Sequence, residues 1–361
     1  MNYDYSHVFV NEQLATDDNR RSDRLLGEDM SSTVIYVGSF PPPFGGVTVK
    51  NALLYQYLSE KTTVDKLDLT KVKEHRLAQM LRLVSSLTLK DCALIVGTSA
   101  AWRRRMTALL YHFNRKKLRH SILMVMGGAV PGDKRYVRQL SCYRQVFVET
   151  QSMKEAFEQK GLENVSIYPN CRERPHNHIQ IRSYSNNRLK CVFFSYVSPE
   201  KGIDIVLGAA EKTPDIDYHI YGRVDENYAK SFLLTISTLP NVEYHGVFNS
   251  VQDDAIDELS QYDVHLFPTR CASEGVPGVI AETKIAGIPT IASNISHNSE
   301  LVTNNYDGII MQENSIDTLV NILCGLSDNS EKVNHLKAAA LKSAEWYYVD
   351  NYIDEVLGYL S

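Results

Sequence analysis

Residues 263–293 read DVHLFPTRCASEGVPGVIAETKIAGIPTIAS, and they decide the fold of the chain around them. Val264 to Phe267 and Pro289 to Ala292 are short apolar runs bounded by turn residues, which is typical of buried strands. Pro277 suits the first position of a helix, so a loop and then a helix are predicted between the two runs. Strand, loop, helix and strand make a βαβ unit, and such units build parallel sheets covered by helices.

The loop and the helix start of this unit form a candidate site. Glu274 lies where the first strand ends, and Glu282 follows eight positions later. Backbone amides at the start of a helix, together with the helix dipole, favour an anionic ligand. The amides in question belong to Gly275, Val276, Gly278 and Val279. An ordinary parallel βα turn with an exposed acid would also explain the glycines and the proline, but it predicts nothing about Glu282.

Composition and charge exclude several classes of protein. The 361 residues are 43% hydrophobic and 22% charged, which fits a globular enzyme of two domains. Residues 1–32 form a polar extension without the apolar core of a signal peptide, and no apolar run reaches the ~18 residues of a spanning helix. Six cysteines without metal-ligand spacing predict reduced thiols and a cytoplasmic protein. A net charge of −5 excludes a generally basic nucleic-acid binder.

The first half of the chain opens with a second candidate site. A strand is predicted over 33–37, followed by a loop that contains Gly45 and Gly46 and by a helix over 47–58. A loop of this kind between a strand and a helix can hold an anion or a sugar, although turn geometry alone explains each glycine equally well. Three prolines at 41–43 do not fit the G-x-G-x-x-G fingerprint, which argues against a nicotinamide or flavin cofactor.

Strands and helices alternate along the rest of the chain, which predicts parallel sheets covered on both faces. Further strands of the first half are expected at 63–67, 93–96, 122–126, 145–148 and 165–168. The polar, aperiodic stretch 171–187 marks a domain boundary. We therefore expect an N-terminal domain over 33–172 and a C-terminal domain over 188–344.

The C-terminal domain opens with a third candidate site. A strand over 190–197 leads into Lys201-Gly202 and a helix, a position where an ammonium can lie on a phosphate beside helix amides. Asp215 and Asp217 formally match an Asp-x-Asp metal motif, but they lie in a turn where acids are common for solvation alone. No metal site is expected.

The pattern Ser-Glu-Gly-x-Pro-Gly-x-x-x-Glu-x-x-x-x-Gly-x-Pro-x-Ile-Ala, from Ser273 to Ala292, closely resembles the Glu-x7-Glu signature of glycosyltransferase family 4. These are retaining GT-B enzymes that build bacterial polysaccharides and O-antigens. The resemblance covers residues 33 to 360 and is densest in the second half. It implies an α/β fold of two Rossmann-like, doubly wound domains that face a cleft, with a last helix over 345–361 that crosses back to the N-terminal domain. It also implies no metal and no cofactor besides the nucleotide-sugar substrate.

The resemblance also assigns roles to residues. Lys201, in Pro-Glu-Lys-Gly, would bind the donor diphosphate, Glu274 the hydroxyls of the sugar, and Glu282 the ribose. Val247 would lie beside the nucleotide base, and the loop of Gly45 and Gly46 near the diphosphate and the acceptor.

One departure from the family pattern concerns the second cation on the diphosphate. The family usually has Gly-Arg where this chain has Ser195-Tyr196. Our hypothesis is that Arg223, after the next strand, supplies the missing charge from another loop. A surface loop residue is the simpler explanation for this arginine.

The stretch 102–120 is the most basic part of the chain and is predicted to be one helix. Its apolar side chains, expected to be core, are Trp102, Met106, Leu109, Leu110 and Phe113. Its basic residues are Arg103, Arg104, Arg105, Arg115, Lys116, Lys117 and Arg119. Each cation near an anionic leaflet contributes about 1 kcal/mol, so we expect this helix to dock on an anionic membrane surface. A second helix with basic residues is expected over 75–89.

These observations predict transfer of a hexose from a nucleotide-sugar to a hydroxyl of a lipid-linked or polysaccharide glycan precursor. We expect the protein to be cytoplasmic or peripheral on the cytoplasmic face of the membrane. A GT-B epimerase of sugar nucleotides would share this architecture but would need no acceptor. A non-catalytic partner subunit would keep the fold, and the altered Ser195-Tyr196 is compatible with it.

Overall fold

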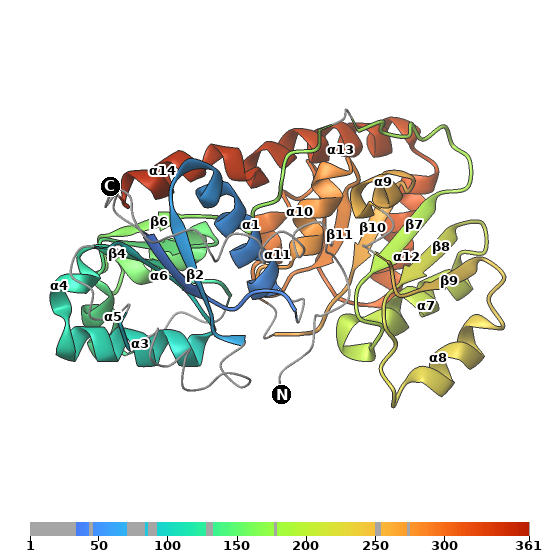
Figure 1. Ribbon diagram of the computed structural model, residues 1–361. Helices are drawn as coiled ribbons and strands as arrows, with labels where there is room; N and C mark the ends of the chain where they lie inside the picture. The colour runs from blue at the N-terminus through green and yellow to red at the C-terminus, as the bar shows by residue number, and fades with distance from the viewer. Residues whose placement is uncertain are drawn as a thin grey trace. The chain divides into compact units, whose positions relative to one another are not determined.

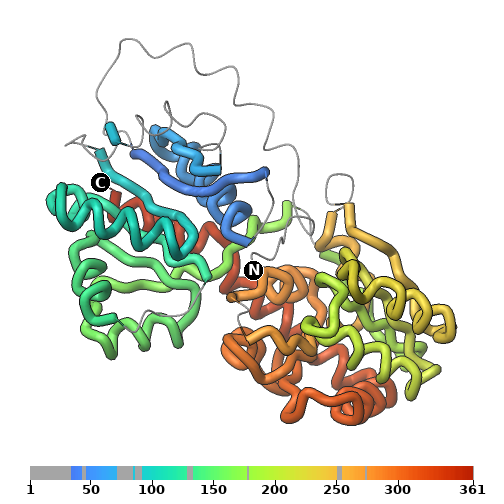
Figure 2. The backbone as a smooth tube through the Cα atoms, turned by 90° about the horizontal axis from the view of Figure 1, so that it is seen from below, coloured from blue at the N-terminus to red at the C-terminus, as the bar shows by residue number. Residues whose placement is uncertain are grey.

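A computed structural model describes residues 34–42, 46–70, 84–85, 92–127, 133–176, 179–249, 254–272 and 275–360. The chain divides into two units, which Figures 1 and 2 show from two sides. The C-terminal unit comprises Arg174–Tyr347. The N-terminal unit comprises the described residues before Arg174 and the segment that begins at Tyr348.

The N-terminal unit is built on a parallel sheet in the order β2-β1-β3-β4-β5-β6. Its strands are β1 (Val34–Gly38), β2 (Val64–Asp68), β3 (Leu94–Gly97), β4 (Ser121–Met124), β5 (Gln145–Val148) and β6 (Val165–Ile167). Each lies within one or two residues of its predicted position, because a short buried run bounded by turn residues is a clear signal. Every neighbouring pair is parallel, as expected.

Helices cover both faces of this sheet. The core on one face includes side chains from α3 (Ala100–Phe113), α4 (Arg115–Leu118), α5 (Lys134–Leu140) and α6 (Gln151–Glu158). The core on the other face includes side chains from α1 (Gly46–Lys61), η5 (Val349–Asn351) and α14 (Ile353–Gly358). The chain from Tyr348 on therefore returns to the N-terminal unit, as expected, and Figure 1 shows α14 beside α1. The prediction of one helix over 345–361 is wrong, since η4 (Ala344–Tyr347), η5 and α14 are separate short helices.

The basic stretch 102–120 forms two helices, not the single helix predicted. Asn114 ends α3, and its side chain accepts a hydrogen bond from the amide of Lys117 and so begins α4. An asparagine at this position competes for backbone donors, which favours a cap over a continuous helix. The other predicted basic helix, 75–89, lies outside the described residues except for Val84 and Ser85.

The expectation for the apolar side of this stretch is also wrong in part. Met106 and Leu110 are buried, whereas Leu109 is 47% exposed and Phe113 is 85% exposed. The face of α3 that packs on the sheet repeats at i, i+3, i+4 and i+7 from Arg103, which leaves Leu109 and Phe113 to one side.

The C-terminal unit has a second parallel sheet, in the order β12-β11-β10-β7-β8-β9. Its strands are β7 (Lys190–Phe194), β8 (Asp217–Tyr221), β9 (Val242–Gly246), β10 (Val264–Phe267), β11 (Thr290–Ser293) and β12 (Gly308–Met311). From β7 the chain moves outward through β8 to β9, and from β10 it moves outward in the opposite direction. The order therefore reverses between β7 and β10.

Helices again cover both faces. One core includes side chains from α7 (Ile203–Lys212), which follows η3 (Pro199–Lys201), from α8 (Ala229–Ile236) and from α12 (Ile316–Ser327). The other includes side chains from α9 (Ala255–Ser260), α10 (Gly278–Ile285) and α11 (Asn298–Leu301). α13 (Ser330–Ser343) and η4 (Ala344–Tyr347) end this unit. The predicted strand-loop-helix-strand unit is thus β10, α10 and β11.

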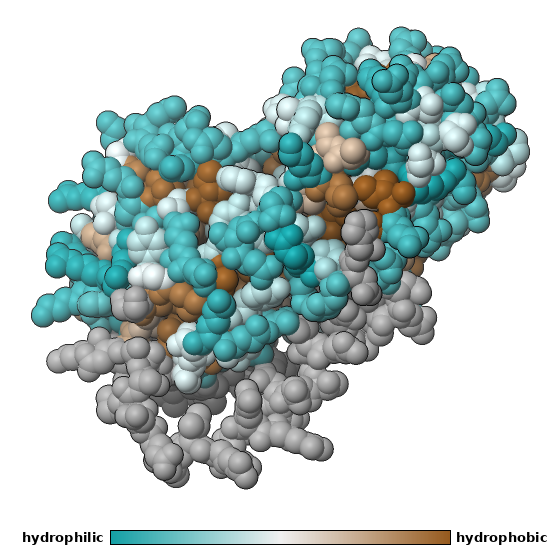
Figure 3. Space-filling view, turned by 90° about the horizontal axis from the view of Figure 1, so that it is seen from above, coloured by the Kyte–Doolittle hydropathy of each residue, from teal (hydrophilic) through white to brown (hydrophobic). Residues whose placement is uncertain are grey.

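Within the described residues, no helix combines the length and the apolar character that crossing a bilayer requires. The face seen in Figure 3 is mostly hydrophilic, with small groups of hydrophobic residues set among the hydrophilic ones.

Candidate functional site

The reversal of strand order between β7 and β10 defines where a ligand is expected. In open α/β sheets, ligands bind outside the carboxyl ends of the strands at such a switch point. β7 and β10 are neighbours, with Cys191 opposite Val264 and Val192 opposite His265. The loop that carries Lys201 and the loop that carries Glu274 therefore leave the sheet from adjacent strands.

The loop after β7 forms a tight turn at Lys201 and Gly202. Ser198 begins η3, and its hydroxyl accepts a hydrogen bond from the amide of Lys201 at 3.4 Å. Gly202 has a φ of +81°, and a Cβ at this position would lie 2.0 Å from the carbonyl oxygen of Pro268. Only glycine permits this close approach, so the turn at Lys201 packs directly on the residue that follows β10.

Arg270 joins the two loops a second time. Its guanidinium donates to both carboxylate oxygens of Asp204 at 2.6 and 2.9 Å and to the carbonyl of Pro199 at 2.7 Å. Its amide donates to the carbonyl of Glu200 at 2.8 Å. The structure therefore brings the Lys201 turn to the β10–α10 loop, a link that depends on Arg270, which sequence reasoning missed.

The first residues of the β10–α10 loop are also tied to the rest of the sheet. The hydroxyl of Ser293 donates to the carbonyl of Thr269 at 2.7 Å. The side-chain amide of Asn314 donates to the carbonyls of Pro268 and Thr269 at 3.1 and 3.2 Å. The loop therefore leaves β10 along a fixed path.

The predicted amide cluster lies at the start of α10. Pro277 is the N-cap, and the helix begins at Gly278, one residue later than predicted. Val276 and Val279 are buried in the core shared by α9 and α10, and Gly275 lies just before them. Glu274 lies outside the described residues, so its predicted position beside the sugar is not described.

Glu282 lies within α10 and is 3% exposed. Two positions later, Lys284 forms a buried ion pair with Asp307 at 2.5 Å, which anchors α10 to the turn before β12. Burial lowers the pKa of Lys284, although the carboxylate of Asp307 acts in the opposite direction. Glu282 is therefore held on a helix whose position is fixed by packing and by an ion pair.

Arg223 lies in the loop after β8, directly beside the altered Ser195-Tyr196 segment. The amide of Val197 donates to the carbonyl of Arg223 at 2.8 Å, and a Cβ on Gly222 would lie 1.8 Å from the carbonyl oxygen of Ser195. The side chain of Arg223 is 52% exposed, and its guanidinium lies 3.3 Å from the carboxylate of Glu226. The loop thus places a cation next to the position where the family arginine is missing.

Two of the predicted site residues, Val247 and Gly46, are exposed at the surface. Val247 follows β9 and is 47% exposed. Gly46 is the exposed first residue of α1, and Gly45 lies outside the described residues.

At the carboxyl ends of its strands, the N-terminal sheet carries a buried ion pair that sequence reasoning missed. Lys50 of α1 pairs with Glu149, the residue that follows β5. The second carboxylate oxygen of Glu149 accepts a hydrogen bond from the amide of Gly127 at 2.5 Å. An acid directly after a buried strand was the available signal.

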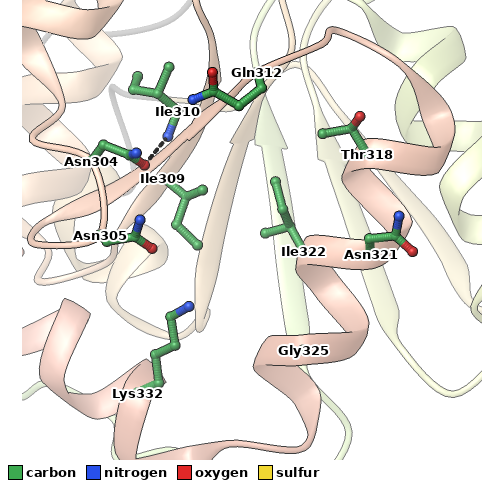
Figure 4. A pocket seen from close by; sticks show the side chains of 10 residues that line it. All are labelled: Asn304, Asn305, Ile309, Ile310, Gln312, Thr318, Asn321, Ile322, Gly325 and Lys332. Carbon is green, nitrogen blue, oxygen red and sulfur yellow. Dashed lines mark hydrogen bonds between the residues drawn. The ribbon is translucent and has the colours of Figure 1, made fainter.

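A shallow pocket of about 380 Å³ lies beside β12 and α12 in the C-terminal unit (Figure 4). Its lining includes Asn304, Gln312, Asn321 and Lys332, and Asn304 accepts a hydrogen bond from the amide of Ile310 at 3.0 Å. It includes none of the predicted donor-binding residues. We therefore place the candidate site at the switch point instead.

Comparison with known proteins supports the sequence resemblance over part of the chain. Residues 176–343 match the family described as Glycosyl transferases group 1. A 127-residue segment is 30% identical to the UDP-Gal:alpha-D-GlcNAc-diphosphoundecaprenol alpha-1,3-galactosyltransferase of Escherichia coli. That segment is 35% of this chain and 28% of the length of that relative.

Solved structures share the fold at low sequence identity. Anabaena HepE in complex with UDP has a TM-score of 0.68 at 15% identity, over 91% of this chain and 99% of that one. The apo lipopolysaccharide outer core galactosyltransferase WaaB has a TM-score of 0.65 at 14% identity, over the same shares. The predicted α/β fold of the GT-B class, with two Rossmann-like sheets, is confirmed.

Proposed function

We propose that this chain, whose residues 176–343 match the group 1 glycosyl transferases, is a retaining glycosyltransferase that moves a sugar from a nucleotide-sugar donor to a hydroxyl acceptor. The observation that supports this most directly is the junction of the Lys201 turn with the β10–α10 loop through Gly202, Pro268 and Arg270. This junction holds the turn that carries Lys201 against the loop that leads to the backbone amides at the start of α10.

The proposed chemistry follows from the charges that develop during the reaction. As the nucleotide diphosphate departs, Lys201 and the amides at the start of α10 would stabilise its negative charge. A lysine and a phosphate 4 Å apart attract by roughly 4 kcal/mol at intermediate dielectric, before desolvation. Lys201 and Arg223 would supply the positive charge here, so the proposed transfer needs no metal ion and no cofactor. Glu274 would hold hydroxyls of the sugar, and Glu282 those of the ribose.

The donor and the acceptor can be proposed from the relatives. HepE was solved with UDP and with UDP-glucose, and the relative from Escherichia coli is named for UDP-Gal and for a GlcNAc-diphosphoundecaprenol acceptor. We propose a UDP-hexose donor and a sugar on a lipid diphosphate as the acceptor, in the synthesis of a bacterial surface polysaccharide such as an O-antigen.

The test is UDP release by the purified protein across a panel of UDP-sugars, with and without a short-chain GlcNAc-diphospholipid. We expect turnover with at least one hexose, unchanged by EDTA, and a product whose anomeric configuration by NMR equals that of the donor. Lys201→Ala should lower turnover at least 100-fold, whereas Lys212→Ala, an exposed lysine paired with Asp317, should not change it. Equal activity of both variants would refute the assignment of Lys201.

The same panel separates the alternatives. An epimerase would convert a UDP-sugar in the absence of any acceptor, and a non-catalytic subunit would bind UDP without turnover. The matches to glycosyl transferases do not favour either alternative.

We further propose that α3 and α4 dock on an anionic membrane surface, which is where a lipid-linked acceptor lies. Arg103 and Lys117 cannot take part because they are buried, and Lys117 donates to the carbonyl of Cys92 at 2.6 Å. The exposed cations are Arg104, Arg105, Arg115, Lys116 and Arg119, beside the exposed Leu109 and Phe113. Apolar side chains inserted among basic ones are typical of helices that lie on membranes.

Vesicle sedimentation tests this docking. Binding should require anionic lipid, and Phe113→Ser should weaken it at least fivefold, because one buried aromatic side chain is worth about 1.5–3 kcal/mol. Leu234→Ser, at an exposed leucine of α8 in the other unit, is the control. Equal vesicle binding by both variants would reject this surface.

A further inference from the structure

Two histidines and a glutamate meet on the outer strands of the C-terminal sheet. His219 belongs to β8, and Glu243 and His245 belong to the edge strand β9. Nδ1 of His219 and Nε2 of His245 lie 2.9 Å apart. The carboxylate of Glu243 lies 3.6 Å from Nδ1 of His219, and one ligand atom from each residue falls within 4.8 Å of the others. The proposed transfer uses none of these three side chains.

An irregularity in strand pairing creates this meeting. His219 lies opposite Glu243 and Ile220 opposite Tyr244, but Tyr221 lies opposite Gly246. His245 is therefore an extra residue of β9, and bulges of this kind change where a side chain points. Its imidazole lies edge to edge with that of His219, with ring centres 5.2 Å apart and planes at 17°, and the two facing nitrogens share a hydrogen bond.

Two tyrosine rings pack against the imidazoles and fix their positions. His245 stacks on Tyr221 at 4.4 Å between ring centres, and His219 packs against Tyr262 at 5.0 Å. The hydroxyls of Tyr221 and Tyr262 both donate to one carboxylate oxygen of Glu258, at 2.5 and 2.7 Å. Packing against these hydrogen-bonded tyrosines therefore restrains both imidazole rings.

The two nitrogens share a hydrogen bond in the metal-free protein, and their separation also allows a single metal ion to replace that bond after a small rotation of the rings. Zinc–nitrogen bonds of about 2.0–2.1 Å at angles between about 90° and 109° place the two nitrogens about 2.9–3.4 Å apart. Two imidazoles and one carboxylate are a ligand set that Zn²⁺ and neighbouring divalent transition metals accept, with further positions open to water.

We propose that His219, Glu243 and His245 form a binding site for a divalent transition-metal ion, with Zn²⁺ as the best match. The ion would link β8 to the edge strand β9 and so stabilise the outer part of this sheet.

Calorimetric titration of the full-length protein with ZnCl₂ tests the site. One equivalent should bind, and His219→Ala and His245→Ala should each weaken binding at least tenfold. Glu243→Gln should weaken it severalfold and is safe for folding because Glu243 is 66% exposed. His335→Ala removes an exposed histidine of α13 and should leave Zn²⁺ affinity unchanged.

Two further measurements identify the ligands. Cu²⁺ should give an electron paramagnetic resonance spectrum with nitrogen couplings that disappear in the variant that lacks both histidines. Zn²⁺ at roughly 100 times its dissociation constant should raise the unfolding temperature of the wild-type protein and of His335→Ala but not that of His245→Ala. Equal Zn²⁺ affinity in all variants, a Co²⁺ spectrum with a thiolate band from a cysteine, or no binding at millimolar Zn²⁺ would each overturn the proposal.

Discussion

Arg223 is the residue that, by our hypothesis, supplies from a different loop the charge that Ser195-Tyr196 lacks. Its backbone is hydrogen-bonded beside Ser195-Tyr196, and its guanidinium pairs with the carboxylate of the exposed Glu226. If it contacts the donor diphosphate, Arg223→Ala should weaken UDP binding about tenfold, because charge-assisted hydrogen bonds contribute about 1.5–3 kcal/mol. Isothermal titration with UDP measures this, and Arg188→Ala, at an arginine paired with Asp217, is the control. Unchanged affinity for UDP would assign Arg223 to the surface.

His265 provides a pH-dependence prediction at the same scale. It is fully buried in β10, Nδ1 lies 3.1 Å from the hydroxyl of Thr290, and burial lowers its pKa to about 3. The unfolded chain binds a proton below about pH 6.5 while the folded chain does not, so stability falls as the pH falls from 6.5 toward 3. Between pH 7.5 and 5.0 this residue alone should remove about 2 kcal/mol.

Urea unfolding at the two pH values measures this loss. His265→Gln keeps a polar partner for Thr290 but does not titrate, so its stability should depend less on pH than that of the wild type by the same amount. His112→Gln, at an exposed histidine of α3, should retain the wild-type dependence. A wild-type dependence in His265→Gln would mean that His265 is not the group responsible.

At the scale of elements, the sequence predicted strands better than contacts between strands. Val264–Phe267 and Gln145–Val148 were predicted to the residue, because apolar runs between turn residues carry their signal locally. Asn114, by contrast, divides the basic helix through a local hydrogen bond whose signal was overlooked. The His219–His245 cluster could not be predicted, because residues 26 positions apart meet only through strand register and an irregularity in pairing.

The ion pair between Arg270 and Asp204, which we call the clamp, leads to a prediction about elements. Arg270 and Asp204 are both partly exposed, so their ion pair should add less than about 1 kcal/mol to stability. Its proposed role is to hold the Lys201 turn on the β10–α10 loop. Asp204→Asn should therefore raise the KM for the UDP-sugar severalfold while the free energy of unfolding changes little. Asp317→Asn, at another exposed pair, is the matched control. Equal KM values in the two variants would show that the clamp does not position the donor site.

At the scale of the whole molecule, topology explains why a resemblance that is densest in the second half predicted the fold of both units. In the C-terminal unit the order reverses between β7 and β10, and in the N-terminal unit it reverses between β1 and β3. Each reversal places a glycine-containing loop at the carboxyl edge of its sheet, which is where Lys201 and Gly46 lie. Glycines and a lysine could be found from the sequence because they stand next to strands. The pairing of Arg270 with Asp204 and of Lys50 with Glu149 could not be predicted, because the partners are far apart in the sequence.

The return of the chain end to the N-terminal unit makes the stability of that unit depend on residues 349–360. Val349, Ile353, Val356 and Leu360 are buried in its core. Burying one such side chain contributes about 1.5–3 kcal/mol, so the four together contribute an amount comparable to the 5–15 kcal/mol stability of a whole domain.

Deleting residues 349–361 should therefore unfold the N-terminal unit and leave the C-terminal unit folded. Amide hydrogen exchange should show β4 and β5 losing protection while β10 and β11 keep theirs. Asp354→Ala, which removes only the exposed pair with Lys61, should preserve protection in both sheets, and retained protection of β4 in the deletion would contradict the dependence argued here.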